Sequence, residues 1–118
     1  MADPSNKGKG IMYKFHNKKC VELIDDIYIF NGCILSNDQT KFYFVDSARN
    51  EIQVCNYKDG NILSRETFFK PASYPELGGV FDGASFNKAG NMWWAIYGGS
   101  KIILINTTTG FVEKVVEI

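Results

Sequence analysis

Residues 31–63, NGCILSNDQTKFYFVDSARNEIQVCNYKDGNIL, are matched by residues 82–112, DGASFNKAGNMWWAIYGGSKIILINTTTGFV. The dipeptide Asn31-Gly32 corresponds to Asp82-Gly83, and two apolar runs and a glycine-containing turn follow at matching positions in each copy. The copies lie about fifty residues apart, a period typical of propeller blades built from short strands. The sequence therefore predicts tandem blades of a β-propeller.

Four strands are expected in each copy, because apolar or alternating runs of suitable length are separated by turn residues. No segment shows helical periodicity, and Pro71 and Pro75 disfavour a helix in the connection between the copies. A shorter hairpin, with strands near residues 11–16 and 20–24, resembles the second half of a further repeat. The eight other strands are expected near residues 32–35, 41–46, 51–56, 62–69, 83–86, 91–97, 101–106 and 111–118.

The predicted fold class is all-β, a partial propeller of about two and a half blades, whereas propellers close with about four to eight. We expect the remainder of the propeller to lie outside this chain, because an open array leaves strand edges and end faces uncovered. A small standalone all-β domain is the alternative. Within one propeller domain, residues 1–118, the expected parts are a flexible start (1–10), a half blade (11–30), a blade (31–69), a connection (70–81) and a second blade (82–118).

Composition argues against several classes of partner. Thirteen basic and thirteen acidic residues cancel, which disfavours binding to nucleic acid or to a membrane surface. No apolar run approaches the roughly 20 residues of a membrane helix, and no signal-peptide core is visible. The cysteines Cys20, Cys33 and Cys55 have no C-x-x-C spacing and are expected to be thiols in a reducing compartment. We therefore expect a cytoplasmic protein.

Asn31-Gly32 and Asp82-Gly83 are ordinary turn dipeptides when each is considered alone. The repeat adds geometry, because equivalent positions in adjacent blades lie at equal height and equal radius around one axis. Both dipeptides precede the first strand of their unit, which lines the central channel of a propeller. An amide oxygen and a carboxylate would then converge on one axial point, and such oxygen ligands suit calcium, magnesium or manganese.

The chain from about residue 11 onward resembles the gluconolactonase, regucalcin and luciferin-regenerating enzyme family. The order and spacing of several short motifs carry the resemblance, not any single motif. These motifs are Asn31-Gly32, YFVDS at 43–47, Asp59-Gly60, Asp82-Gly83, GNMWWA at 90–95 and GGSK at 98–101.

The resemblance implies a six-bladed propeller with one divalent cation (Ca, Zn, Mn or Mg) in its central channel. It implies that Asn31 and Asp82 are metal ligands and that Asp82 is also the general acid or base. The implied reaction is hydrolysis of a small-molecule sugar lactone, since a bound metal polarises a carbonyl and makes a nearby water easier to deprotonate. The alternatives are a calcium-binding regulatory protein of the same fold, or an inactive fragment.

The chain departs from the family pattern in several places. The family's third ligand, a glutamate near its N-terminus, has no counterpart, and its substrate-orienting arginine and asparagine fall before the start of this chain. Asp3 is only a loose match to an acidic residue expected in that region. Proline commonly precedes the Asp-Gly motif, whereas Phe81 stands here without the restraint that proline places on its neighbour's backbone.

Three further features bear on the site or on the fold. Asp46-Ser47 could support the metal site or could cap the end of its strand. His16 has no catalytic partner at a revealing spacing, so a surface histidine is expected. Trp93 and Trp94 should point to opposite faces of a strand, which predicts that both faces of that strand are covered.

Overall fold

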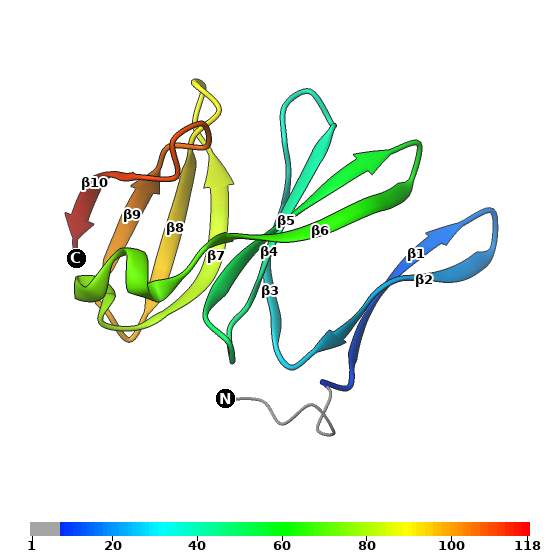
Figure 1. The fold of residues 1–118 in the computed structure, drawn as a ribbon, viewed down its shortest axis with the longest axis horizontal. Helices are drawn as coiled ribbons and strands as arrows, with labels where there is room; N and C mark the ends of the chain where they lie inside the picture. Colours follow the sequence, from blue (N-terminus) through cyan, green and yellow to red (C-terminus); the bar gives the residue numbers. More distant parts are fainter. Residues whose placement is uncertain (1–7) are drawn as a thin grey trace.

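The structure is a computed structural model that describes residues 8–118. Within that range it contains ten strands in three antiparallel sheets and two single-turn 3-10 helices, which confirms the predicted all-β class (Figure 1). Asp3 and residues 1–7 of the expected flexible start lie outside the described residues. In the part of the chain that is described, no helix has the length and apolar character needed to span a bilayer.

Two four-stranded sheets correspond to the two copies of the repeat. The first has the order β3-β4-β5-β6 and the second the order β7-β8-β9-β10, so each strand pairs with its neighbour in sequence. Their bounds are Phe30–Leu35, Lys41–Asp46, Glu51–Lys58 and Asn61–Phe69 for β3 to β6, and Val80–Phe86, Met92–Tyr97, Lys101–Ile105 and Val112–Glu117 for β7 to β10. The expected strands are therefore present, with small differences at their ends.

A two-stranded sheet precedes them, formed by β1 (Gly10–His16) and β2 (Lys19–Ile27). Between the four-stranded sheets the chain makes two short 3-10 helices, η1 (Pro71–Ser73) and η2 (Pro75–Leu77). Each has proline at its start, where the missing N–H costs nothing. Strand β7 begins at Val80, inside the segment expected to be connection, because Val80 and Phe81 pair with Tyr97 and Ile96.

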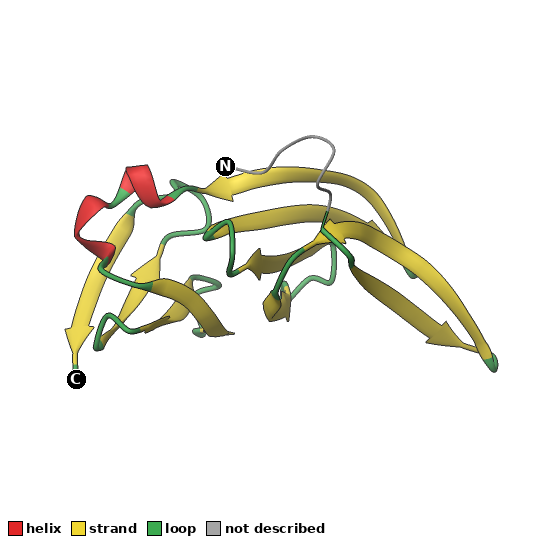
Figure 2. Ribbon diagram, turned by 90° about the horizontal axis from the view of Figure 1, so that it is seen from below, coloured by secondary structure: helices red, strands yellow, loops and turns green. Residues whose placement is uncertain are grey.

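The three sheets follow one another across the long dimension of the molecule (Figure 2). The two four-stranded sheets meet along β3 and β7, the first strand of each sheet, which we call the inner strands. The repeat predicted this contact between the first strands of neighbouring units.

Two apolar layers hold the sheets together, one on each face of the middle sheet. Strand β4 supplies both, because alternate side chains point to opposite faces. Tyr43 and Val45 pack toward the second four-stranded sheet, where Trp94 and Phe81 are fully buried. Phe44 packs toward the hairpin, against residues such as Ile27.

The outer face of the last sheet is less covered than the sequence predicted. Trp94 is fully buried between the sheets, whereas Trp93 on the opposite face is only partly buried. Large apolar side chains are also exposed at both ends of the described array, among them Phe15 (75%), Phe111 (73%) and Ile118 (88%). The prediction of two covered faces therefore holds for Trp94 and only in part for Trp93.

Candidate functional site

Asn31 and Asp82 come together from the inner strands of the two four-stranded sheets. The Asn31 Nδ2 group donates a hydrogen bond to Asp82 Oδ1, although the residues are 51 positions apart in sequence. Both residues are partly buried. The two side chains therefore lie together where β3 and β7 meet, as the repeat predicted, but the Asn31 nitrogen and not the expected oxygen faces the carboxylate.

Both dipeptides lie at irregularities of their strands. Pairing between β3 and β4 shifts register between Asn31 and Ile34, and pairing between β7 and β8 shifts between Phe81 and Ala84. A β-bulge of this kind releases backbone from the ladder and redirects a side chain. The two copies differ in detail, because Asn31 is still paired with Val45 before its shift, whereas Asp82 lies within the shift that follows Phe81.

Gly32 makes the close approach of the two strands possible. Its φ is +55°, a left-handed conformation that side chains with Cβ adopt at a cost. A Cβ at this position would collide with Trp94 Cζ3 and with the carbonyl oxygen of Asp82. At the equivalent Gly83, nothing lies within 4 Å of a built Cβ. Gly32 is therefore required by its surroundings, whereas the space around Gly83 would admit a side chain.

The turn between β4 and β5 supports the backbone that leads into Asp82. Ser47 Oγ donates to the carbonyl oxygen of Phe81 at 2.8 Å. Asn50 Oδ1 accepts from the backbone N–H of Phe81 at 2.8 Å, and its Nδ2 donates to Gly79 O at 3.0 Å. Sequence reasoning weighed Ser47 but missed Asn50, whose only signal was its place in a predicted turn.

The Asp46 side chain caps the end of its strand, which is one of the two interpretations of Asp46-Ser47. It is almost fully buried, and its carboxylate accepts from the backbone N–H groups of Tyr28 (2.9 Å), Ile29 (3.0 Å) and Ala48 (3.2 Å). Arg49 Nη1 lies 3.3 Å from Asp46 Oδ2. All these partners belong to connections, so Asp46 fixes the chain that enters β3 and does not face Asp82.

Phe81, which stands where the resembled family has proline, is a core residue. Its ring is fully buried and packs edge-to-face against Phe69 (centroids 5.7 Å apart) and Trp94 (5.6 Å). Edge-to-face rings of this kind add to the stabilisation from burial. His16 is exposed at the end of β1, as expected, and takes no part in the site.

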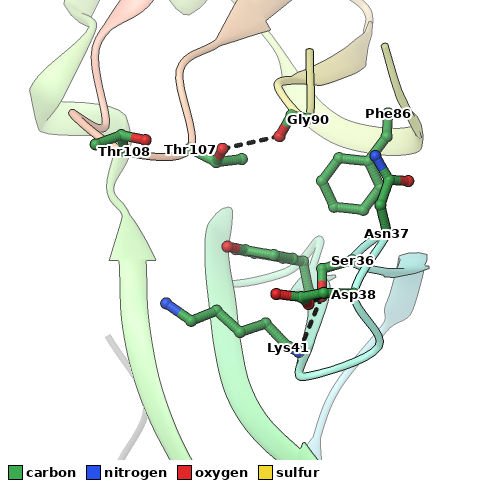
Figure 3. A pocket seen from close by; sticks show the side chains of 9 residues that line it. Ser36, Asn37, Asp38, Lys41, Phe86, Gly90, Thr107 and Thr108 are labelled. Carbon is green, nitrogen blue, oxygen red and sulfur yellow. Dashed lines mark hydrogen bonds between the residues drawn. The ribbon is translucent and has the colours of Figure 1, made fainter. Parts of the chain in front are cut away.

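A separate cavity of about 510 Å³ opens between the two four-stranded sheets at the far ends of the inner strands (Figure 3). Its lining includes Asp38, Lys41 and Thr107 but neither Asn31 nor Asp82. Hydrogen bonds from the Ser36 and Thr40 hydroxyls hold the pKa of Asp38 at about 2, below its ordinary 3.8. The Asp38 carboxylate therefore accepts its hydrogen bonds from residues of its own turn.

The donor set at Asn31 and Asp82 suits a hard cation but is only part of a site. Amide and carboxylate oxygens are the ligands that calcium, magnesium and manganese prefer. Asn31 Oδ1 accepts from the N–H of Gly32 at 3.0 Å, while its nitrogen faces the carboxylate. Across residues 8–118, no group of three or more His, Cys, Asp or Glu side chains is arranged to hold a metal.

Comparison with known proteins identifies relatives of this arrangement. A luciferin-regenerating enzyme superposes with a TM-score of 0.89 at 28% identity, over 96% of this chain and 38% of that one. A calcium-binding protein, regucalcin, from Agrobacterium tumefaciens superposes with a TM-score of 0.83 at 26% identity, over 100% of this chain and 40% of that one. Regucalcin of Xenopus laevis is 30% identical over 92 residues, which are 76% of this chain.

The chain spans 30% of the length of the Xenopus laevis regucalcin, so it corresponds to a part of such a protein. The family model described as the SMP-30/Gluconolactonase/LRE-like region matches residues 1–118, the whole sequence. The chain therefore belongs to the SMP-30, gluconolactonase and luciferin-regenerating enzyme-like family.

Proposed function

We propose that this chain supplies one side of a divalent-cation site in a propeller that hydrolyses a small-molecule lactone. Asn31 and Asp82 are the proposed ligands, and Asp82 is also the proposed acid or base. The observation that carries the proposal is the contact between the Asn31 amide and the Asp82 carboxylate at the meeting point of β3 and β7. The family of the chain, which is named in part for gluconolactonase, supports the choice of reaction.

The side chain of Asn31 can present either end of its amide to the space beside Asp82. With nitrogen toward the carboxylate, as observed, the pair is a donor and an acceptor and needs no ion. With oxygen toward the carboxylate, two electronegative atoms would face each other, and a cation between them would remove the repulsion. We expect Asn31 to turn its amide when a cation binds.

In this proposal, Asp82 exchanges a proton with a water molecule beside it. A bound divalent cation supplies polarisation of the lactone carbonyl and lowers the pKa of nearby water. With the cation bound, one oxygen of the Asp82 carboxylate would contact the cation and the other would take a proton from that water molecule. The oxygen of the deprotonated water would bond to the lactone carbonyl carbon, the ring C–O bond would then break, and Asp82 would return its proton to the leaving alkoxide, which gives the open hydroxy acid.

A calcium-binding protein without important turnover is the second candidate. It is favoured by the calcium-binding regucalcin among the structural relatives and by the amide and carboxylate oxygens that Asn31 and Asp82 can offer to a hard cation. The three cysteines are free thiols, which supports the proposal of a reducing compartment such as the cytoplasm for either candidate.

Manganese or calcium titration of the chain, followed by calorimetry, tests the metal site. Asn31→Ala and Asp82→Ala should each weaken binding strongly, whereas Asp59→Ala, in an exposed Asp-Gly turn, should leave binding unchanged. Equal binding by wild type and Asp82→Ala would show that the site is elsewhere.

Hydrolysis of gluconolactone with manganese or zinc separates the two candidates. Turnover that is lost in Asp82→Ala supports the lactonase. Metal binding without turnover in the full-length protein supports the calcium-binding candidate, and turnover that survives Asp82→Ala removes the catalytic role of that residue.

A further inference from the structure

We propose that the turn at residues 46–50 of the first blade sets the aim of Asp82 in the second, with Asn50 as the positioning residue. Asn50 and Ser47 do not touch Asp82 and act through the backbone of Phe81. The consequence for metal binding rests on the proposed role of Asp82 as a ligand. The geometric part of the proposal, that Asn50 determines the contact between Asp82 and Asn31, does not.

Both polar backbone groups of Phe81 are held by this one turn. Its N–H donates to Asn50 Oδ1 and its carbonyl oxygen accepts from Ser47 Oγ, each at 2.8 Å. Asn50 also makes a second bond, from its Nδ2 to Gly79 O at 3.0 Å, which fixes the part of the strand before Phe81. The peptide on either side of Phe81 is thereby oriented by side chains of the neighbouring blade.

These bonds matter because the sheet ladder does not hold Asp82 itself. Phe81 pairs with Ile96, and regular pairing resumes only at Ala84 with Trp94. Asp82 and Gly83 lie in the interruption, where the direction of the Asp82 side chain follows from the orientation of the Phe81–Asp82 peptide. The hydrogen bonds from Asn50 and Ser47 to Phe81 therefore fix the backbone immediately before Asp82.

The turn is itself rigid enough to serve as a reference. The backbone N–H groups of Arg49 and Asn50 both donate to Asp46 O, at 3.1 and 2.8 Å. Asn50 has a φ of +57°, a left-handed conformation that asparagine tolerates better than most residues. The conformation directs its side chain outward from the turn toward strand β7.

The same turn also fixes the chain that enters β3. The Asp46 carboxylate accepts from the N–H groups of Tyr28 and Ile29, and Ser47 N donates to Ile29 O at 2.9 Å. Asn31 follows two residues later. One short turn thus anchors the approach to both side chains of the candidate site, which fixes their relative position without contacting either.

Nuclear magnetic resonance of the metal-free chain can detect the hydrogen bond between Asn31 and Asp82 directly. This signal reports the direction of the Asp82 side chain and does not depend on the overall stability of the chain. In wild type, the Asn31 side-chain amide should show a coupling across its hydrogen bond to the Asp82 carboxylate. Asn50→Ala should lose that signal. Asn50→Asp, which keeps an acceptor for the N–H of Phe81 but loses the donor to Gly79 O, should restore only part of it. Asn56→Ala removes an exposed bond to Ser64 far from the turn and should keep it.

Manganese affinity supplies the second readout. Asn50→Ala should bind manganese about 10- to 100-fold more weakly than wild type, the usual loss when a residue supporting a metal ligand is removed. Asn56→Ala should match wild type. Ser47→Ala deletes only the hydroxyl bond to Phe81 O, so it should reduce the Asn31–Asp82 signal and the manganese affinity less than Asn50→Ala does. It replaces Asn50→Ala as the test variant if that protein does not fold.

The outcomes separate this proposal from the proposed function. An Asn31–Asp82 signal that persists in Asn50→Ala, or that is lost equally in Asn56→Ala, overturns the positioning role even if manganese binds. A signal that depends on Asn50 in a chain that binds no manganese leaves the positioning role standing and removes the proposed metal site.

Discussion

Replacing Gly32 by alanine should separate the two halves of the candidate site. The new methyl group would meet the ring of Trp94, with Cη2 at 2.9 Å, and would also collide with the carbonyl oxygen of Asp82. Neither obstacle is the flexible end of a side chain, since Trp94 is fully buried and Asp82 O is backbone. The clash can be relieved only if β3 and β7 move apart.

Two costs add at this position. An alanine in the left-handed conformation, at φ +55°, costs about 1–2 kcal/mol relative to glycine. Inserting a methyl group into packed surroundings costs typically about 1–3 kcal/mol. We therefore expect Gly32→Ala to lower the free energy of unfolding by about 2–5 kcal/mol.

The matched control is Gly83→Ala in the second copy of the repeat. Nothing lies within 4 Å of a Cβ there, and the φ of Gly83 is not positive. Its effect should stay within about 1 kcal/mol of wild type, because alanine restricts the unfolded chain without strain in the folded one.

Urea unfolding followed by tryptophan fluorescence measures both variants, since Trp93 and Trp94 lie in β8 beside the site. The coupling between the Asn31 amide and the Asp82 carboxylate should vanish in Gly32→Ala and persist in Gly83→Ala. Equal free energies of unfolding for the two variants would refute the reasoning, because the contrast between the glycines comes entirely from packing and backbone conformation.

Three further outcomes are expected. Asp46→Ala removes the shared acceptor of backbone N–H groups and should cost about 3 kcal/mol or more in urea unfolding, whereas a loss below about 1 kcal/mol would contradict its anchoring role. The lowered pKa of Asp38 means that its carboxylate stabilises the folded state above pH 3.8 and that this contribution is lost as pH falls toward about 2. Asp38→Asn should therefore flatten the stability profile in that acid range, and identical acid profiles for the two proteins would exclude this effect. The Cys55 thiol is buried, whereas Cys20 and Cys33 are exposed, so a thiol-modifying reagent should label Cys20 and Cys33 in the folded chain and Cys55 only on unfolding. Rapid labelling of all three thiols would show that the second apolar layer is open.

Much of the architecture could be predicted because it depends on local pattern. Alternating apolar residues and turn residues specify strands and hairpins within a few positions of each other in sequence. The repeat then supplied the long-range relation, since equal units related by rotation place equivalent residues at equal radius. That symmetry is why the sequence alone could predict that Asn31 and Asp82, 51 residues apart, lie close together.

The support around the site could not be predicted in the same way. Ser47 and Asn50 read as ordinary turn residues, and nothing in their local sequence says that they reach Phe81, 34 and 31 residues away. Asp46 left open whether it supported a metal or capped a strand, and only its contacts with Tyr28 and Ile29 decided for the cap.

The sequence by itself determined the strands, their order and the pairing of Asn31 with Asp82, because periodicity and repetition are properties of the chain. Tertiary structure alone decided that Gly32 must be glycine while Gly83 is unconstrained, and that one turn clamps the approaches to both side chains. The physical reason is that close packing and cross-blade hydrogen bonds join residues far apart in sequence, and no local pattern records which side chain meets which backbone.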